Sequence, residues 1–353
     1  MTRPRLDPRL PLSELHVHLG AAVTPAIMWG IAHAQGIRLP TKDYWAFRDL
    51  ITVGRRHRSF ASYLDLFHWT ELIQSSPIAI ERSVYEVIGG AYRKNNVTQI
   101  EVRFNPMKRN RGGEQDLDHI IAAAVRGMDR GVLEYPQVRA GLVFCLDRAF
   151  GRELNEIIAA KAIAWRTRGV VGIDIAGPIV DGFRFDEYAE IYAECRRAGL
   201  GLTVHAGETG GHDEVREALV ALEPDRIGHG VRSVEDPAVL AMLRERGTVL
   251  EVCPSSNLST RVVSGIGGLR RVMRSLVEHD VRFTINTDGP EMLRSYLRAE
   301  LLMLLRNEIL DLDQVHRAIQ TGHEASFLDR APTIESSVTG SNGRAPMPIG
   351  AGL

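Results

Sequence analysis

The 353-residue sequence predicts an α/β fold, a single (β/α)8 barrel of the TIM type. Eight short, β-rich apolar runs recur along the chain, and each is followed by a longer stretch with helical periodicity. Strands that alternate with helices indicate a parallel sheet, because parallel neighbours need a crossover connection. Eight such units are the number that closes a barrel, and polar residues gather where the runs end.

The eight expected strands are short and rich in Val, Ile, Leu and Phe. In chain order they are Glu14–Leu19, Gln99–Phe104, Ala140–Leu146, Val170–Ile175, Gly201–Val204, Asp225–Gly228, Val249–Cys253 and Arg282–Asn286. The stretches between them have one apolar face at helical spacing, as in Asp213–Leu222, Asp236–Leu243 and Leu269–Leu276.

Two segments depart from this alternation. A long insertion, at about residues 25–96, follows the first strand and is rich in aromatic residues and helical periodicity. An insertion at this point lies over the C-terminal mouth of a barrel, so we expect a lid; the alternative is extra helices packed on the outside. Residues 331–353 are rich in Gly, Pro and Ser without an apolar period and are expected to be disordered. Residues 1–330 are therefore expected to form one domain.

The composition argues against several classes of protein. Lys and Arg number 43 against 44 Asp and Glu, so the basic excess typical of nucleic-acid binders is missing. There is no run near the roughly 18 apolar residues of a membrane span, and no signal-peptide core near the start. The three cysteines are far apart, which favours neither a disulfide framework nor a zinc ribbon. We expect a cytoplasmic protein that binds neither nucleic acid nor membranes; its oligomeric state is left open.

Polar residues at the C-terminal ends of barrel strands indicate catalysis. Residues of this kind end or follow the eight runs: His16, His18, Arg103, Asn105, Asp147, Asp174, His205, Glu208, His229, Cys253, Asn257, Asn286 and Asp288. A single histidine here could be structural. Four histidines and an aspartate at one rim instead favour a functional site.

A metal site is expected within this group. His16 and His18 are two residues apart on a strand, so both side chains point to the same face, toward the barrel interior. His205 and Asp288 can add a third nitrogen and an oxygen. Imidazole with some carboxylate suits Zn²⁺, and an open position for water is typical of a catalytic site. We expect one zinc ion per chain.

Three residues are candidates for acid–base chemistry. Glu208 follows His205 by three residues, and a carboxyl group in a dry pocket has a raised pKa and can donate a proton near neutrality. His229 could accept a proton from an activated water, and Asp288 could accept a hydrogen bond from the same water. The alternative for Glu208 is a structural acid near a helix N-terminus.

Six motifs occur in the order seen in one known family: LHVHL, VVGIDIAG, VHAGE, RIGHG, CPSSN and NTDGP. Over about residues 12–305 the sequence resembles the adenosine deaminase family of metal-dependent amidohydrolases. The resemblance implies zinc ligands at His16, His18, His205 and Asp288. It also implies that Glu208 protonates the purine ring nitrogen beside the amino-bearing carbon and that His229 orients or deprotonates the attacking water.

The substrate contacts implied by the resemblance are altered in this sequence. His18 and the backbone N–H of Gly177 are expected to contact the substrate. Gly20 replaces the family's acid that contacts the ribose, Gly289 replaces the aspartate that binds the purine's imidazole nitrogen, and Pro178 stands where an acid is common. The groups that activate water are all present, whereas those that recognise adenosine are not.

The sequence therefore predicts a zinc-dependent hydrolase that deaminates a small 6-aminopurine of the nucleoside type, with release of ammonia. The candidate substrates are adenosine, adenine, a substituted adenine, and aminodeoxyfutalosine of menaquinone biosynthesis. Two other possibilities are a different hydrolysis at the same zinc, of an amide, lactone or phosphoester, and a catalytically silent purine-binding protein. The second would be expected to lack metal ligands or Glu208, and all of these are present.

Overall fold

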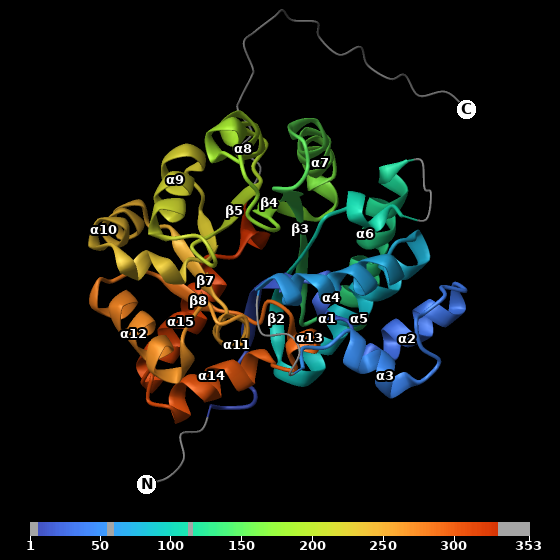
Figure 1. Cartoon of the computed structure of the whole chain (residues 1–353), viewed down its shortest axis with the longest axis horizontal. Helices are drawn as coiled ribbons and strands as arrows, with labels where there is room; N and C mark the ends of the chain where they lie inside the picture. Colours follow the sequence, from blue (N-terminus) through green and yellow to red (C-terminus); the bar gives the residue numbers. More distant parts are fainter. Residues whose placement is uncertain (1–5, 55–59, 112–115, 331–353) are drawn as a thin grey trace, which may run out of the picture.

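Eight parallel strands follow one another around the centre of the molecule in the order of the chain (Figure 1). The computed structural model describes residues 6–54, 60–111 and 116–330. The strands are β1 Leu12–His18, β2 Val97–Phe104, β3 Arg139–Asp147, β4 Val170–Ala176, β5 Gly201–Ala206, β6 Arg226–His229, β7 Val249–Val252 and β8 Phe283–Ile285. Each expected run overlaps its strand, and the predicted (β/α)8 barrel is confirmed.

The strands are continuous apolar runs because both of their faces are covered, one by the barrel interior and the other by helices. β8 is three residues long, shorter than the five-residue run expected there. Between β8 and β1 the barrel closes through a single bridge, from Val17 to Asp288. The backbone N–H of His18 donates to the carbonyl of Asp288 (2.8 Å), and the N–H of Asp288 donates to the carbonyl of His16 (2.9 Å).

Helices form the outer ring of the barrel and its connections. They are α1 Leu19–Ala22, α2 Pro25–Ala34, α3 Tyr44–Leu50, α4 Phe60–Ile73, α5 Pro77–Asn95, α6 Leu117–Glu134, α7 Arg152–Ala164, α8 Ala189–Arg197, α9 His212–Leu222, α10 Pro237–Arg246, α11 Pro254–Ser259, α12 Gly265–Glu278, α13 Pro290–Leu293, α14 Leu297–Arg306 and α15 Leu312–Glu324. Short 3₁₀ helices are η1 Met107–Arg109, η2 Arg166–Arg168, η3 Phe185–Tyr188, η4 Val231–Glu235 and η5 Phe327–Asp329.

Local sequence explains where several helices begin. Ser76 and Asp236 accept a hydrogen bond from the first turn of α5 and α10, and each is followed by a proline at the first helical position. Asp311 and Gln314 form a capping box at the start of α15. In α9 the expected apolar face is buried against the barrel.

Helices α1 to α5 lie between β1 and β2 in the described parts of that connection. Helix α4 crosses in front of the strands in Figure 1, whereas α2 and α3 lie at the outer edge of the molecule. Side chains of α4 and the C-terminal ends of several strands line the same cavity. That this insertion acts as a lid stays a prediction.

Two further expectations concern the rest of the chain. The tail at 331–353 lies outside the described residues, so its expected disorder and the extent of the domain at 1–330 stay predictions. Within the described ranges, no helix is both long and apolar enough to cross a membrane.

Candidate functional site

A cavity of about 340 Å³ opens at the C-terminal ends of the strands. Its volume is within the range of small-molecule sites, about 300–1,000 Å³. The wall includes five of the residues expected in the site, namely His18, His205, Glu208, His229 and Asp288. The polar ends of the runs are thus brought to one place, as the barrel topology requires.

Three histidines form the centre of this site. His16 and His18 come from the end of β1, and His205 comes from β5 on the other side of the barrel. One ring nitrogen of each lies within 4.8 Å of the other two, and the Nε2 atoms of His18 and His205 are 3.2 Å apart. The two β1 histidines share the inward face, as their spacing predicts.

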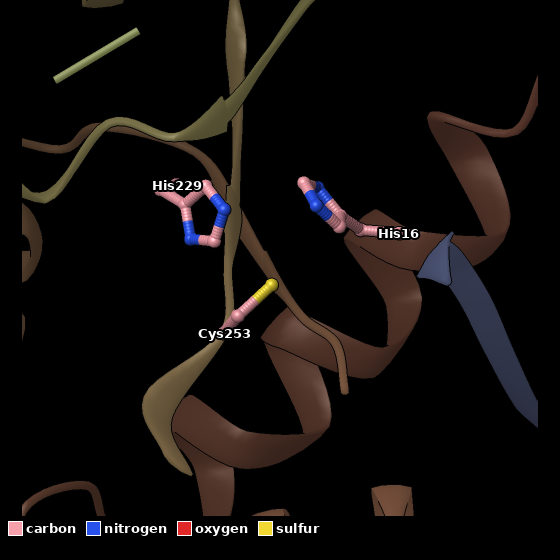
Figure 2. A group of neighbouring side chains, drawn as sticks. All are labelled: His16, His229 and Cys253. Carbon is pink, nitrogen blue, oxygen red and sulfur yellow. The ribbon is translucent and has the colours of Figure 1, made fainter. Parts of the chain in front are cut away.

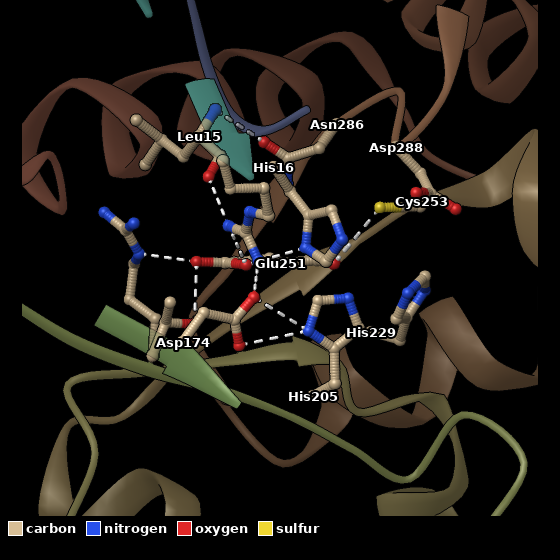
Figure 3. Close-up of polar contacts among 12 residues, drawn as sticks. Leu15, His16, Asp174, His205, His229, Glu251, Cys253, Asn286 and Asp288 are labelled. Carbon is tan, nitrogen blue, oxygen red and sulfur yellow. Dashed lines mark hydrogen bonds and ion pairs between the residues drawn. The ribbon is translucent and has the colours of Figure 1, made fainter. Parts of the chain in front are cut away.

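Carboxylates hold the outer nitrogens of two of these rings (Figure 3). His16 Nδ1 lies 2.7 Å from Glu251 Oε2, and His205 Nδ1 lies 3.0 Å from Asp174 Oδ2. A carboxylate only accepts hydrogen bonds, so each Nδ1 carries the proton and each Nε2 presents a lone pair to the centre. His16 Nε2 is buried and has no hydrogen-bond partner among the described residues. Converging lone pairs without a donor fit a bound cation.

Burial also favours the neutral form of His16 and of His18. Burial first, and then the nearby Arg103 guanidinium, lowers the pKa of His16 well below its usual value. The pKa of His18 is lowered mainly by burial, and then by His205.

Asp288 lies at the edge of the histidine group. Its Oδ1 is 3.6 Å from His18 Nε2, whereas Oδ2 accepts hydrogen bonds from Ser256 Oγ (2.6 Å) and Tyr63 Oη (3.3 Å). Its backbone has a φ of 61°, in the left-handed region that non-glycine residues rarely adopt. Pairing with β1 therefore holds a strained residue that turns a carboxylate toward the histidines.

A second group of atoms that could bind a metal ion lies beside the three histidine nitrogens. Figure 2 shows His16, His229 and Cys253 pointing toward one another, with one donor atom of each within 4.8 Å of the other two. Cys253 is fully buried, does not line the cavity, and lies with its Sγ 3.5 Å from the carbonyl of Glu251. Burial raises the pKa of its thiol well above the usual value, which disfavours the thiolate that binds metals.

Glu208 and His229 face each other on the cavity wall. Glu208 Oε2 lies 3.6 Å from His229 Nε2, and Glu208 Oε1 has no hydrogen-bond partner among the described residues. Burial, and then the charge of Asp288, raises the pKa of Glu208 well above its usual value. Asn257 Nδ2 lies 3.0 Å from His229 Nδ1, so the Nε2 side of this ring is the one turned to Glu208. The site thus holds a carboxyl group of raised pKa next to an imidazole.

Two of the expected substrate-binding residues line the cavity. They are His18 and Gly177, and Gly177 has a φ of +96°, where glycine is favoured. A Cβ at this position would also lie 2.8 Å from Asp147 Oδ1. A side chain is therefore excluded here, and the backbone is exposed to a ligand.

Gly20 and Gly289, the other two, do not line the cavity but lie directly behind its wall. A Cβ at Gly20 would lie 2.9 Å from a ring carbon of Phe67, and a Cβ at Gly289 would lie 2.9 Å from Tyr63 Oη. Both glycines thus make room for α4 at the mouth of the barrel.

Sequence reasoning missed Glu251, Tyr63 and Ser256. An acid within the apolar run VLEVC was a usable signal for Glu251, because a charge in a strand buried on both faces needs a partner. Ser256 lies within CPSSN, one residue before an expected site residue. Tyr63 is 225 positions from Asp288 and has no local signal.

Known proteins resemble this chain over nearly its whole length. Residues 11–335 match the family model described as adenosine deaminase. An adenosine deaminase of Clostridium kluyveri is 29% identical over 321 residues, covering 91% of this chain and 90% of the relative.

Two solved structures share the fold. The adenine deaminase of Arthrobacter aurescens has a TM-score of 0.80 at 21% identity, covering 90% of this chain and 94% of that one. An amidohydrolase of Burkholderia ambifaria with bound zinc has a TM-score of 0.76 at 23% identity, covering 91% of this chain and 87% of that one.

Proposed function

Because this chain belongs to the adenosine deaminase family, we propose that it is a zinc-dependent enzyme that deaminates a 6-aminopurine nucleoside-type substrate. Family membership makes it a hydrolytic deaminase. We propose in addition that its metal is zinc, which residues carry out the reaction, and what class of substrate it takes. One observation carries it: three histidine nitrogens converge beside a carboxyl group of raised pKa at the end of a closed barrel.

The donor set suits zinc. His16, His18 and His205 would supply three nitrogens and Asp288 an oxygen, the ligand types that Zn²⁺ prefers. A bound zinc ion lowers the pKa of a coordinated water toward about 7 and so supplies a nucleophile at neutral pH. The inward lone pairs of His16 and His205 support this assignment, since no described residue donates to His16 Nε2.

Glu208, His229 and Asp288 would each have a separate role in the proton transfers of the reaction. Glu208, kept neutral by burial, donates its proton to the ring nitrogen beside the amino-bearing carbon. His229, whose Nε2 faces Glu208, orients the attacking water or takes its proton, and Asp288 accepts a hydrogen bond from the same water. Addition of water to this carbon and loss of the amino group as ammonia leave an oxo group on the purine.

The substrate contacts favour a compound other than plain adenosine. Gly177 would offer its backbone N–H to the purine, and His18, which lines the same cavity, would also contact it. Gly20 and Gly289 provide no carboxylate for the ribose or the imidazole nitrogen. A site without these groups cannot select adenosine by them.

Replacing the proposed proton donor tests this function. Glu208→Gln keeps the shape of the side chain but cannot donate a carboxyl proton, so we expect turnover to fall by about 10²–10⁴-fold with unchanged zinc content. Ammonia release is measured over a panel of aminopurines, and zinc by mass spectrometry. The matched control is Glu217→Gln, on the exposed face of α9. Loss of zinc from the Glu208 variant, or full turnover by it, would refute the assignment.

A further inference from the structure

Three cationic side chains follow β2 and lie on the cavity wall: Lys108, Arg109 and Arg111. None of them takes part in the deamination described above. Lys108 and Arg109 belong to η1, and Arg111 follows it in the chain. Their contacts show what this wall can bind.

Arg109 and Arg111 share one carboxylate. Glu71 of α4 lies with Oε1 3.1 Å from Arg109 Nη1 and with Oε2 3.7 Å from Arg111 Nη2. Among residues 6–54, 60–111 and 116–330, Glu71 is the one acid in ion-pair distance of these two guanidinium groups. Within that part of the chain, two positive charges therefore share one negative charge.

The neighbouring ionic groups do not remove this excess. Lys108 forms an ion pair with Asp147, and Arg148 Nη2 lies 3.0 Å from Glu214 Oε1, so each of these cations has its own acid. Asp65 also lines the cavity, but it is exposed to solvent and is not in ion-pair distance of Arg109 or Arg111.

Two nitrogens of the Arg109 guanidinium have no hydrogen-bond acceptor among the described residues. Its residue is 2% exposed, and neither Nε nor Nη1 makes a hydrogen bond within the described part of the chain. Arg109 Nη1 is close enough to Glu71 Oε1 to form an ion pair, but the two groups are not aligned for a hydrogen bond. Buried guanidinium donors without acceptors are costly, so an acceptor from a ligand would stabilise this arrangement.

Gly20 explains how Arg109 comes to be without a second acid. A Cβ at residue 20 would lie 3.2 Å from Arg109 Nη2. An acidic side chain there would meet the guanidinium and neutralise it. Glycine instead leaves the guanidinium room and leaves its charge available.

We propose that this wall is an anion subsite, and that the substrate carries a phosphate or carboxylate on the substituent attached to its purine. The inference rests on the proposed deamination, which requires the purine to bind beside Glu208 in the same cavity. Arg109 and Arg111 would bind the oxyanion, since a planar guanidinium matches both groups with paired hydrogen bonds.

Three probes test the subsite: adenosine, adenosine 5′-monophosphate and adenosine 5′-carboxylic acid. We expect kcat/KM of the zinc-loaded enzyme to be about 10- to 100-fold higher for one of the two anions than for adenosine, the range of a charge-assisted hydrogen bond. The preferred anion identifies phosphate or carboxylate as the recognised group. Equal or better turnover of adenosine would overturn the subsite and leave the deaminase function standing.

Substitutions test which side chains cause the preference for an anionic substrate. Arg109→Met and the more exposed Arg111→Met should each lower kcat/KM for the preferred anion by about 10- to 100-fold. Arg126→Met, on the outer surface of α6 and paired with Glu81, is the matched control and should change nothing. Preference for the anion that persists in both cavity variants would overturn the assignment.

A binding measurement separates the subsite from the chemistry. Calorimetry with the zinc-loaded Glu208→Gln variant gives Kd for the same three probes without turnover. We expect one anion to bind at least 10-fold tighter than adenosine, and this difference to be lost with Arg109→Met. Tighter binding of the anion supports the subsite even if no probe is deaminated, whereas equal Kd values overturn it.

Discussion

At the scale of single residues, Arg103 links the two carboxylates that orient the histidines. Its Nη1 donates to Asp174 Oδ2 (2.9 Å) and its Nη2 to Glu251 Oε2 (2.8 Å), and all three side chains are fully buried. Burial opposes ionisation, but the facing charges hold the pKa of both carboxyl groups below their usual values. The carboxylates are therefore ionised and can fix the protonated nitrogen of His16 and His205.

Removing one of these carboxylates should weaken metal binding. Asp174→Asn keeps the shape of the side chain but removes the charge behind His205, and losses of such a partner typically lower metal affinity about 10- to 100-fold. Zinc affinity is measured by competition with a chelator. The control is Glu245→Gln, which is exposed on α10. An unchanged affinity in the Asp174 variant would mean that His205 is not a metal ligand.

The raised pKa of Glu208 determines whether kcat/KM rises or falls with pH. The carboxyl group must be protonated to act as a donor, so kcat/KM should fall as pH rises through its pKa, and burial places this fall above the usual range of glutamate. The pH–rate profile of the zinc-loaded enzyme measures it. A profile with no alkaline decline would contradict the role of Glu208.

The site histidines could be predicted from sequence, whereas some of their partners could not. His16 and His18 share a face because of strand periodicity, and His205 lies at a strand end, so two short-range patterns are sufficient. Tyr63 reaches Asp288 only because α4 packs over the mouth, and no local pattern encodes that packing.

At the scale of elements, α4 connects the insertion to the site. Tyr63, Phe67 and Glu71 of this helix line the cavity, and the ring of Phe67 lies 6.1 Å from the ring of His18, edge to face. The insertion was expected to be helical, but its position over the mouth depends on Gly20 and Gly289, which leave space for Phe67 and Tyr63.

Shortening Phe67 tests whether α4 acts as a lid. Phe67→Ala removes an aromatic wall of the cavity, and we expect KM to rise about 10-fold, with a smaller change in kcat, because the ring does not reach the reacting atoms. Steady-state kinetics measure both. Trp45→Ala, on the exposed surface of α3, is the control. An unchanged KM would favour the alternative in which the insertion is only outer packing.

The strands themselves were predictable because each is buried on both faces and forms an apolar run. The ends were less predictable: β1 begins at Leu12 rather than at Glu14, and β8 ends at Ile285, one residue before the predicted end. Strand ends depend on hydrogen bonds to the neighbouring strand, which a single run does not contain.

At the scale of the whole molecule, a buried ionic network closes the other end of the barrel. Arg226 donates to Glu101 Oε2 (2.5 Å) and to Glu251 Oε1 (2.6 Å), with its guanidinium 3.5 Å from the centre of the Phe327 ring. Glu101 Oε1 also accepts from Ser326 Oγ (2.9 Å) and from the N–H of Phe327 (2.6 Å). The network thus ties β2, β6 and β7 to η5.

Breaking this network should destabilise the fold. Glu101→Gln leaves a buried guanidinium with less compensating charge, and such losses cost about 3–5 kcal/mol. The free energy of unfolding is measured by urea denaturation. Glu324→Gln, which loses only the half-exposed pair with Arg282, is expected to cost at most about 1 kcal/mol. Equal effects of the two variants would show that the buried network does not stabilise the barrel.

We infer that strands from opposite sides of the barrel bring three imidazoles and one carboxylate around a single zinc ion. X-ray absorption at the zinc edge of the full-length protein, with the metal content of the same sample, tests it most directly. We expect one zinc per chain with nitrogen and oxygen neighbours only, at about 2.0–2.2 Å. A sulfur neighbour at about 2.3 Å would place the ion at Cys253 and rule out the site of three histidines and one aspartate, as would two zinc ions per chain.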